Sequence, residues 1–187
     1  MEEASPELYK TMQKILHDFK KGNAMELRLT ANELIKKAVK NNSKIMAEQS
    51  IAAYVLHKIL TKEHIIKSKA WPRNRAKIVE NLEKMVLCLR RGQQKEFTKM
   101  LARLHSKLER IDSYFGRFVQ SLLDKARVKY ASDAYFMGTS LGQAAELLGA
   151  DKKTLLAYIG ATRLYDKEAI HKGIAERMRE LKKALGD

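Results

Sequence analysis

The spacing of the apolar residues constrains this sequence more than any other feature, because they recur at steps of three and four. The pattern is most regular in one stretch, formed by Phe97, Leu101, Leu104, Leu108, Ile111, Phe115, Phe118 and Leu122. Such steps place side chains on one face of an α-helix, whereas a half-buried strand would need strict alternation. A sustained seven-residue period also suits coiled-coil-like packing. The stretch predicts helix over residues 94–130, either as one helix of about 55 Å or as two helices joined near residue 112.

Four further apolar stripes of the same kind precede this stretch. Their members are Leu8, Met12, Ile15 and Phe19; Leu27, Ala31, Leu34 and Ala38; Ile45, Ala52, Val55, Ile59 and Ile66; and Ile78, Leu82, Met85 and Leu89. Capping and turn signals separate them, at Ser5-Pro6, Gly22-Asn23, Asn41-Asn42, Ser43, Trp71-Pro72 and Gly92. Short connections favour antiparallel neighbours. We expect an all-α protein with an antiparallel helical bundle over residues 1–131.

Cysteine content and hydropathy indicate where such a chain works. Cys88 is the single cysteine, which excludes an internal disulfide framework and fits a reducing compartment. No apolar run approaches the roughly 18 residues of a membrane span, and the first residues do not resemble a signal peptide. We expect a cytoplasmic protein without a membrane partner.

Positive charge is concentrated in the middle of the chain. The 187 residues contain 37 Lys and Arg against 22 Asp and Glu, a formal net charge of +15. Residues 58–129 alone hold 19 of the basic and seven of the acidic residues, a local surplus of 12. Basic side chains that neutralise phosphates release condensed counterions, so the surplus favours a nucleic-acid partner. The alternative is that these charges only solvate helix faces.

Two basic clusters carry most of this surplus. The first contains Lys58, Lys62, Lys67, Lys69, Arg73, Arg75 and Lys77, and the second contains Arg90, Arg91, Lys95, Lys99, Arg103, Lys107 and Arg110. From the first cluster we select Arg73, Arg75 and Lys77 as candidate contacts to DNA.

A different pattern appears at residues 139–160, which read TSLGQAAELLGADKKTLLAYIG. Ala145 is small at a position where two helices must approach closely, and Gly149, four residues later, suits a turn that requires positive φ. Asp151 is placed to cap a second helix, as Ser140 is to cap the first. Leu155 and Tyr158 are expected on the inner face of the second helix.

This segment resembles the helix-turn-helix of small archaeal and bacterial proteins described as predicted antitoxins, and more distantly that of the mercury-resistance regulators. The resemblance covers 22 of the 187 residues. It implies that the second helix enters the major groove of DNA with its exposed early residues against the bases. In this chain those residues are Asp151, Lys152, Lys153, Leu156 and Ala157, with Arg163 just beyond.

Those residue types permit only part of the usual base recognition. Lysines contact phosphate or guanine, and Leu156 and Ala157 suit a thymine methyl group. The second helix has no Arg, Asn or Gln for bidentate base contacts. The motif is therefore either a weak base reader assisted by the basic middle region, or a surface that binds a protein partner.

The sequence lacks the residue patterns of common enzymes. It contains no phosphate-binding loop of the GxxxxGK[S/T] type and no Gly-x-Ser-x-Gly elbow. The two histidines nearest in sequence, His57 and His64, are seven residues apart, about 10 Å along a helix, which is too far for one metal ion. We expect no catalytic site, no metal ion and no cofactor.

These observations predict a non-enzymatic protein that binds double-stranded DNA, as a transcription regulator or an antitoxin-like repressor. Residues 58–129 would attach it and residues 151–163 would orient it. Residues 132–187 would form the second domain, a helix-turn-helix plus a last helix capped by Asp166. That last helix packs either on the bundle or in a homodimer. Two alternatives stay open, a helical interaction module for an acidic protein partner and an RNA-binding protein.

Overall fold

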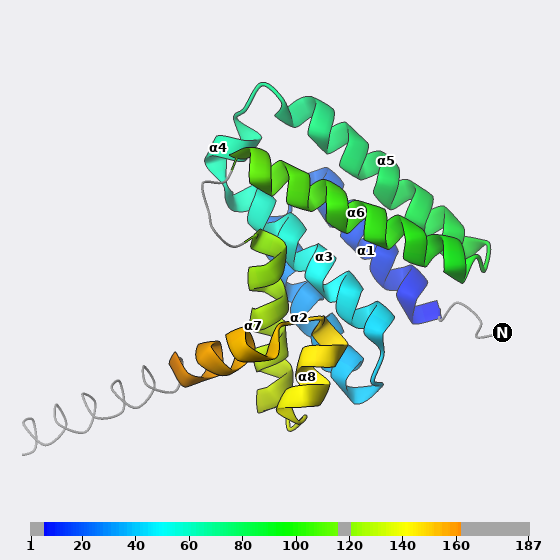
Figure 1. The fold of residues 1–187 in the computed structure, drawn as a ribbon. Coiled ribbons are helices and arrows are strands. Elements are labelled where there is room, and N and C mark those ends of the chain that lie inside the picture. The colour runs from blue at the N-terminus through cyan, green and yellow to red at the C-terminus, as the bar shows by residue number, and fades with distance from the viewer. Residues whose placement is uncertain (1–5, 116–120, 162–187) are drawn as a thin grey trace, which may run out of the picture.

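The computed structural model describes residues 6–115 and 121–161, and every regular element in these two ranges is a helix (Figure 1). The elements are α1 (Pro6–Lys21), α2 (Ala24–Lys40), α3 (Lys44–Thr61), α4 (Glu63–Ile66), α5 (Trp71–Arg90), α6 (Gln94–Phe115), α7 (Leu122–Phe136) and α8 (Leu141–Leu148). A further helix follows over residues 152–161. The all-α prediction is confirmed. Among the described residues, no helix is both long and apolar enough to cross a membrane.

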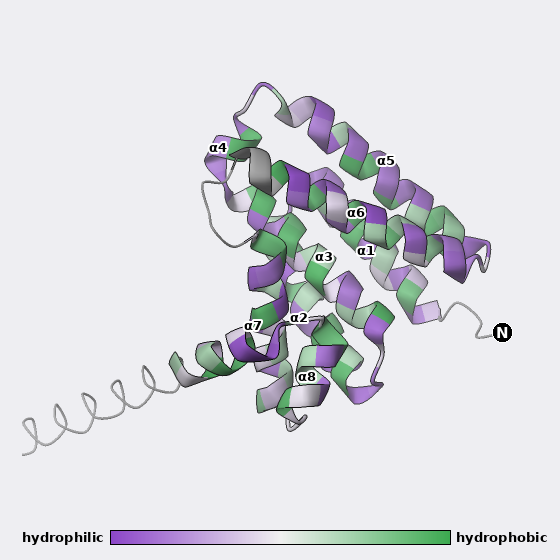
Figure 2. Cartoon of the chain, in the orientation of Figure 1, coloured by the Kyte–Doolittle hydropathy of each residue, from purple (hydrophilic) through white to green (hydrophobic). Residues whose placement is uncertain are grey.

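Helix α3 lies at the centre of the fold. It packs against α1, α2, α6, α7 and α8, and its sequence is apolar on more than one face, with Ile51, Val55, Leu56 and Ile59 almost completely buried. Helices α5 and α6 lie side by side and cover α1 and α3 with their apolar faces, while their polar faces are turned outward (Figure 2). The exposed backs of α5 and α6 therefore carry most of the basic middle region.

The turn signals in the sequence coincide with the helix ends. Gly22 and Gly92 have positive φ at the ends of α1 and α5, and Asn42 has a φ of 46° after α2. The Ser43 hydroxyl accepts a hydrogen bond from the Met46 amide at the start of α3. Pro72 lies in the first turn of α5, where its missing amide proton costs nothing.

The long apolar stripe is divided between two helices. Its members from Phe97 to Ile111 are buried along α6, which ends at Phe115, and Leu122 is buried at the start of α7. The Ser121 hydroxyl accepts a hydrogen bond from the Asp124 amide at 3.0 Å and so caps α7. One continuous helix over residues 94–130 is therefore wrong, and the two-helix alternative holds with a later break than residue 112.

One hydrophobic core joins the two ends of the chain. Leu148, Leu155 and Ile159 belong to the same cluster of buried side chains as the core of α1 to α6. The expected domain boundary between residues 131 and 132 falls inside α7. Arg163, Asp166 and the expected last helix lie outside the described residues.

Candidate nucleic-acid interface

Residues 140–161 form two helices joined by a short turn, which we call the helical corner. At its start the Ser140 hydroxyl accepts a hydrogen bond from the Gln143 amide, and the Gln143 side chain accepts one from the Ser140 amide. Gly149 ends α8 in the left-handed conformation with a φ of 62°. Asp151 caps the second helix, because its Oδ2 accepts hydrogen bonds from the Thr154 amide and hydroxyl, both at 2.8 Å.

The second helix of the corner has one buried and one open face. Leu155 and Ile159 are buried against the rest of the molecule. Lys152, Lys153, Leu156 and Ala157 are all exposed. Leu156 is the clearest case, since an aliphatic side chain is left 60% exposed. The four candidate contacts that the structure describes in this helix therefore share a surface that solvent reaches.

Tyr158 does not lie where the sequence placed it. It is 40% exposed, and Ile159 takes the inner position instead. Leu155 and Ile159 are four residues apart and lie directly above one another on a helix, whereas Tyr158 is displaced toward the edge of that face. From the sequence alone, either Tyr158, three residues after Leu155, or Ile159, four residues after it, could have lain on the inner face.

Arg127 of α7 anchors the corner to the bundle. Its Nη1 donates a hydrogen bond of 2.6 Å to the Leu148 carbonyl, at the end of α8. The same guanidinium pairs with both carboxylate oxygens of Glu48 in α3, at 2.9 and 3.0 Å. His105 of α6 completes the network, with its Nδ1 3.1 Å from Glu48 Oε2. Four helices therefore meet at one ion-pair network.

The charge of Glu48 is strongly stabilised in this network. Burial alone would raise the pKa of its carboxyl group, but hydrogen bonds from His105 and Arg127 and the charge of Arg127 outweigh it and lower the pKa to about 2. Glu48 is therefore ionised at neutral pH. No residue of this network was singled out from the sequence, because its members are far apart along the chain.

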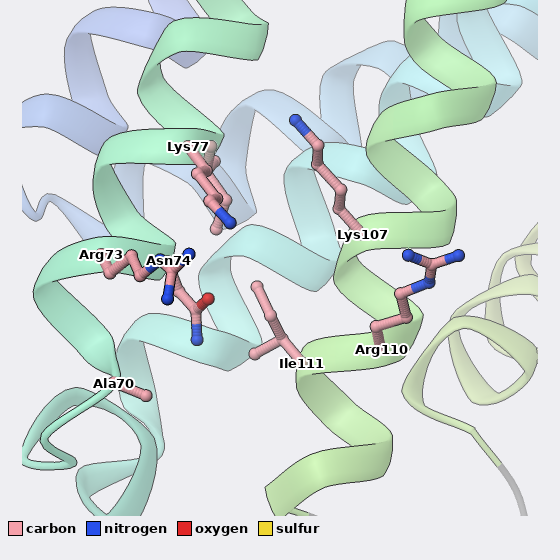
Figure 3. Close-up of a pocket in the computed structure, with 8 residues that line it drawn as sticks. Ala70, Arg73, Asn74, Lys77, Lys107, Arg110 and Ile111 are labelled. Atoms are coloured by element: carbon pink, nitrogen blue, oxygen red, sulfur yellow. The ribbon is translucent and has the colours of Figure 1, made fainter.

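A basic groove lies between α5 and α6 (Figure 3). Arg73 and Lys77 project into it from α5, and Lys107 and Arg110 from α6. Its volume is about 460 Å³, and its lining contains no acidic side chain. None of the four cations has an ion-pair partner within the described part of the chain. Four cations without a direct ion-pair partner around one hollow give it a positive potential that attracts anions.

Arg75 lies outside the groove although it is two residues from Arg73. Its Nη2 donates a hydrogen bond of 2.6 Å to the Lys20 carbonyl at the end of α1. Residues two apart on a helix point in different directions, whereas residues four apart share a face. The sequence spacing alone could therefore have shown that Arg75 does not share a helix face with Arg73 and Lys77. Lys107 and Arg110 were in the second basic cluster, but only the packing of α5 on α6 brings them to the first.

Cations on α5 and α6, including two of the groove, act on a nearby carboxyl group. Glu80, an exposed residue of α5, has a lowered pKa, first because Lys84 donates a hydrogen bond to it and then because of positive charges that include Lys107 and Lys77. A lowered carboxyl pKa is the expected response to nearby cations. The groove therefore faces solvent as a cationic surface.

Helix α7 packs against α6 and α8. It runs from near the end of α6 to α8 (Figure 1). A helix of 15 residues spans about 22 Å. This is shorter than one turn of duplex DNA, about 34 Å.

Comparison of the chain with protein-family models, with curated proteins and with solved structures gave no match. Among the described residues, no three His, Cys, Asp or Glu side chains are grouped so that they could hold a metal ion. Function is therefore inferred from the groove and the corner themselves.

Proposed function

We propose that this protein binds double-stranded DNA, with the helical corner acting as a helix-turn-helix at the C-terminal side of an antiparallel helical bundle. The role that suits such a protein is that of a transcription regulator or an antitoxin-like repressor. The observation that carries the proposal is the open face of residues 152–161. It presents Lys152, Lys153, Leu156 and Ala157 together on a helix whose start is capped.

The basic groove supports the proposal by supplying phosphate contacts. Phosphate contacts position a protein on DNA and provide most of the sequence-independent affinity. Arg73, Lys77, Lys107 and Arg110 are available for this role because none of them forms an ion pair with a described acidic residue. The groove would hold the DNA backbone while the second helix of the corner lies in the major groove.

The residue types of the corner predict modest sequence selectivity. Leu156 and Ala157 can contact a thymine methyl group, whereas bidentate base contacts usually come from Arg, Asn or Gln. No such residue occurs between 152 and 161. We expect a strong dependence of affinity on salt and a smaller dependence on sequence.

The decisive experiment compares two double charge reversals by fluorescence anisotropy with a labelled duplex over a range of salt concentrations. The first variant is K152E/K153E, on the open face of the corner. The control is K10E/K36E, which changes the net charge equally at exposed positions of α1 and α2, outside the basic middle region. We expect about a tenfold or larger loss of affinity for the first variant and a much smaller loss for the control.

Two results would overturn the proposal. One is wild-type protein that shows no salt-sensitive binding to duplex DNA at low ionic strength. The other is an equal loss of affinity in both variants, since this would mean that only total charge matters. Single-stranded DNA and RNA of the same length belong in the same titration, because preference for RNA would select the RNA-binding alternative.

The exposure of Leu156 favours a second candidate, a module that binds an acidic protein. A large apolar side chain in the centre of a basic surface is typical of a protein interface. In that case the L156S and K152E/K153E variants would both leave DNA affinity unchanged.

A further inference from the structure

A second pocket, of about 470 Å³, lies where α3, α6 and α7 meet. Its volume is within the range of sites for small organic molecules. Leu101 and Ala102 of α6 form part of an apolar wall, opposite the charged residues Lys44 and Glu48 of α3. Arg127 closes the pocket on the side of α7. The pocket therefore combines an apolar surface with a few charged groups.

The charges of this pocket favour an anionic ligand. Glu48 is already paired with Arg127 and His105, so its negative charge is neutralised within the protein. Lys44 is exposed and has no partner within the described part of the chain. Because Glu48 and Arg127 neutralise each other, the lining carries one surplus positive charge, at Lys44, next to an apolar wall.

His105 lines this pocket and is already engaged with Glu48. Its Nδ1 faces Glu48, whereas its Nε2 is buried and has no hydrogen-bond partner among the described residues. Because Nε2 is enclosed by protein, the rest of the imidazole ring lines the pocket and no ligand contact is assigned to this nitrogen.

We propose that this pocket binds a small organic carboxylate, and that Arg127 couples its occupancy to the helical corner. The carboxylate lies near Lys44 and the guanidinium of Arg127, and the apolar body lies along Leu101 and Ala102. The coupling rests on the proposed DNA binding, whereas the ligand site does not.

Arg127 provides a direct physical route for the coupling. The guanidinium that lines the pocket also donates to the Leu148 carbonyl, at the junction of α8 with the turn of the corner. An anion at Arg127 competes with that neutral carbonyl more readily than with the doubly bonded Glu48 carboxylate. Bound ligand therefore loosens the attachment of the corner and lowers the affinity for DNA. By reciprocity, DNA lowers the affinity for the ligand by the same factor.

The ligand site is tested without DNA, by thermal unfolding with benzoate and hexanoate as probes. We expect both to raise Tm in a saturable way, by about 3–6 °C at ten times the Kd. Benzamide, the neutral isostere of benzoate, should give no shift. Inorganic phosphate distinguishes this site from the basic groove. It lacks an apolar body, so a Tm shift caused by phosphate would report binding to the groove.

Two variants locate the binding. A102F fills the pocket from an exposed position of α6, so it should abolish the benzoate shift while the protein remains folded. K44Q should weaken benzoate binding about tenfold, and K40Q, an exposed lysine of α2, serves as its control. Absence of a shift with both carboxylates at millimolar concentration overturns the site. A shift that persists in A102F does the same.

The coupling is tested by adding benzoate to the DNA titration of wild-type protein and of A102F. We expect the affinity for DNA to fall about fivefold or more with saturating benzoate in wild type and to stay constant in A102F. Unchanged DNA affinity in wild type that binds benzoate overturns the coupling and leaves the ligand site intact. Failure of DNA binding in every sample contradicts the proposed function instead.

Discussion

The Arg127 guanidinium occupies the space into which a side chain at Gly149 would extend. A Cβ atom placed on Gly149 would lie 2.7 Å from Arg127 Nη1, which is shorter than such contacts can be. The φ of 62° at Gly149 independently disfavours any residue with a Cβ. The turn of the corner and its anchor on α7 therefore both require glycine at this position.

We expect G149A to lower the free energy of unfolding by about 1–3 kcal/mol, because alanine is strained in the left-handed conformation and its Cβ displaces Arg127. Denaturant unfolding followed by circular dichroism measures this change. G160A is the matched control, since Gly160 lies in the second helix of the corner with nothing within 4 Å of its Cβ position. It should leave stability unchanged or raise it by up to about 1 kcal/mol. Equal stability of G149A and wild type would contradict the role of Gly149.

Glu48 predicts a specific dependence of stability on pH. Its pKa is lowered from 4.5 to about 2 in the folded protein, so between these values the unfolded chain binds more protons. The stabilisation is complete above pH 4.5 and is lost as the pH falls toward 2. The variant E48Q should be less stable than wild type by about 2–3 kcal/mol at pH 7.

The difference between E48Q and wild type should shrink as the pH falls through this window. Urea unfolding at several pH values between 2.5 and 7 measures it. Parallel stability curves for the two proteins would show that Glu48 is not the titrating group.

The different positions of Arg73 and Arg75 predict different effects of two neighbouring arginines. R73A/K77A removes two cations of the groove, so DNA affinity should fall and the slope of log K against log salt should decrease by up to about 2. R75A removes the hydrogen bond to the Lys20 carbonyl, so it should lower stability by about 1 kcal/mol. It should change DNA binding much less, and a larger effect of R75A on the salt slope would place the DNA elsewhere.

The cap at Asp151 predicts a contrast between two substitutions. D151A leaves the Thr154 amide without its acceptor, so the second helix should fray and its amide protons should exchange faster. D151N retains a side-chain oxygen and is an equally good cap. Amide exchange measured by NMR for residues 152–157 should rise in D151A and stay near wild type in D151N. Similar exchange in the two variants would mean that the cap does not hold this helix.

The sequence was sufficient to predict the buried faces of α1, α2, α5 and α6, whereas Ile66, expected on the third helix, lies half-buried in the separate short helix α4. The four stripes before residue 92 lie against the core because the period of an α-helix is almost independent of context. Caps such as Ser43 and Asp151 were equally visible, since they act over three residues. Local rules of this kind also placed Gly149 at the turn.

Features that depend on distant parts of the chain were not predictable. Arg127 and Glu48 are separated by 79 residues, and no sequence rule pairs them. The groove could not be predicted from either basic cluster alone, because it forms only where α5 packs on α6. The long stripe gave no sign that the helix breaks after Phe115 rather than near residue 112, since the apolar spacing continues across the break.

The length of α7 has a consequence for the proposed binding of DNA. If the groove and the corner contact the same duplex, α7 is one of the elements that set the distance between backbone attachment and base reading. One additional turn in α7 would shift the two contacts apart by about 5.4 Å, roughly one and a half base-pair steps along the duplex. The footprint of the protein on DNA is then encoded in the number of residues between Ser121 and Met137.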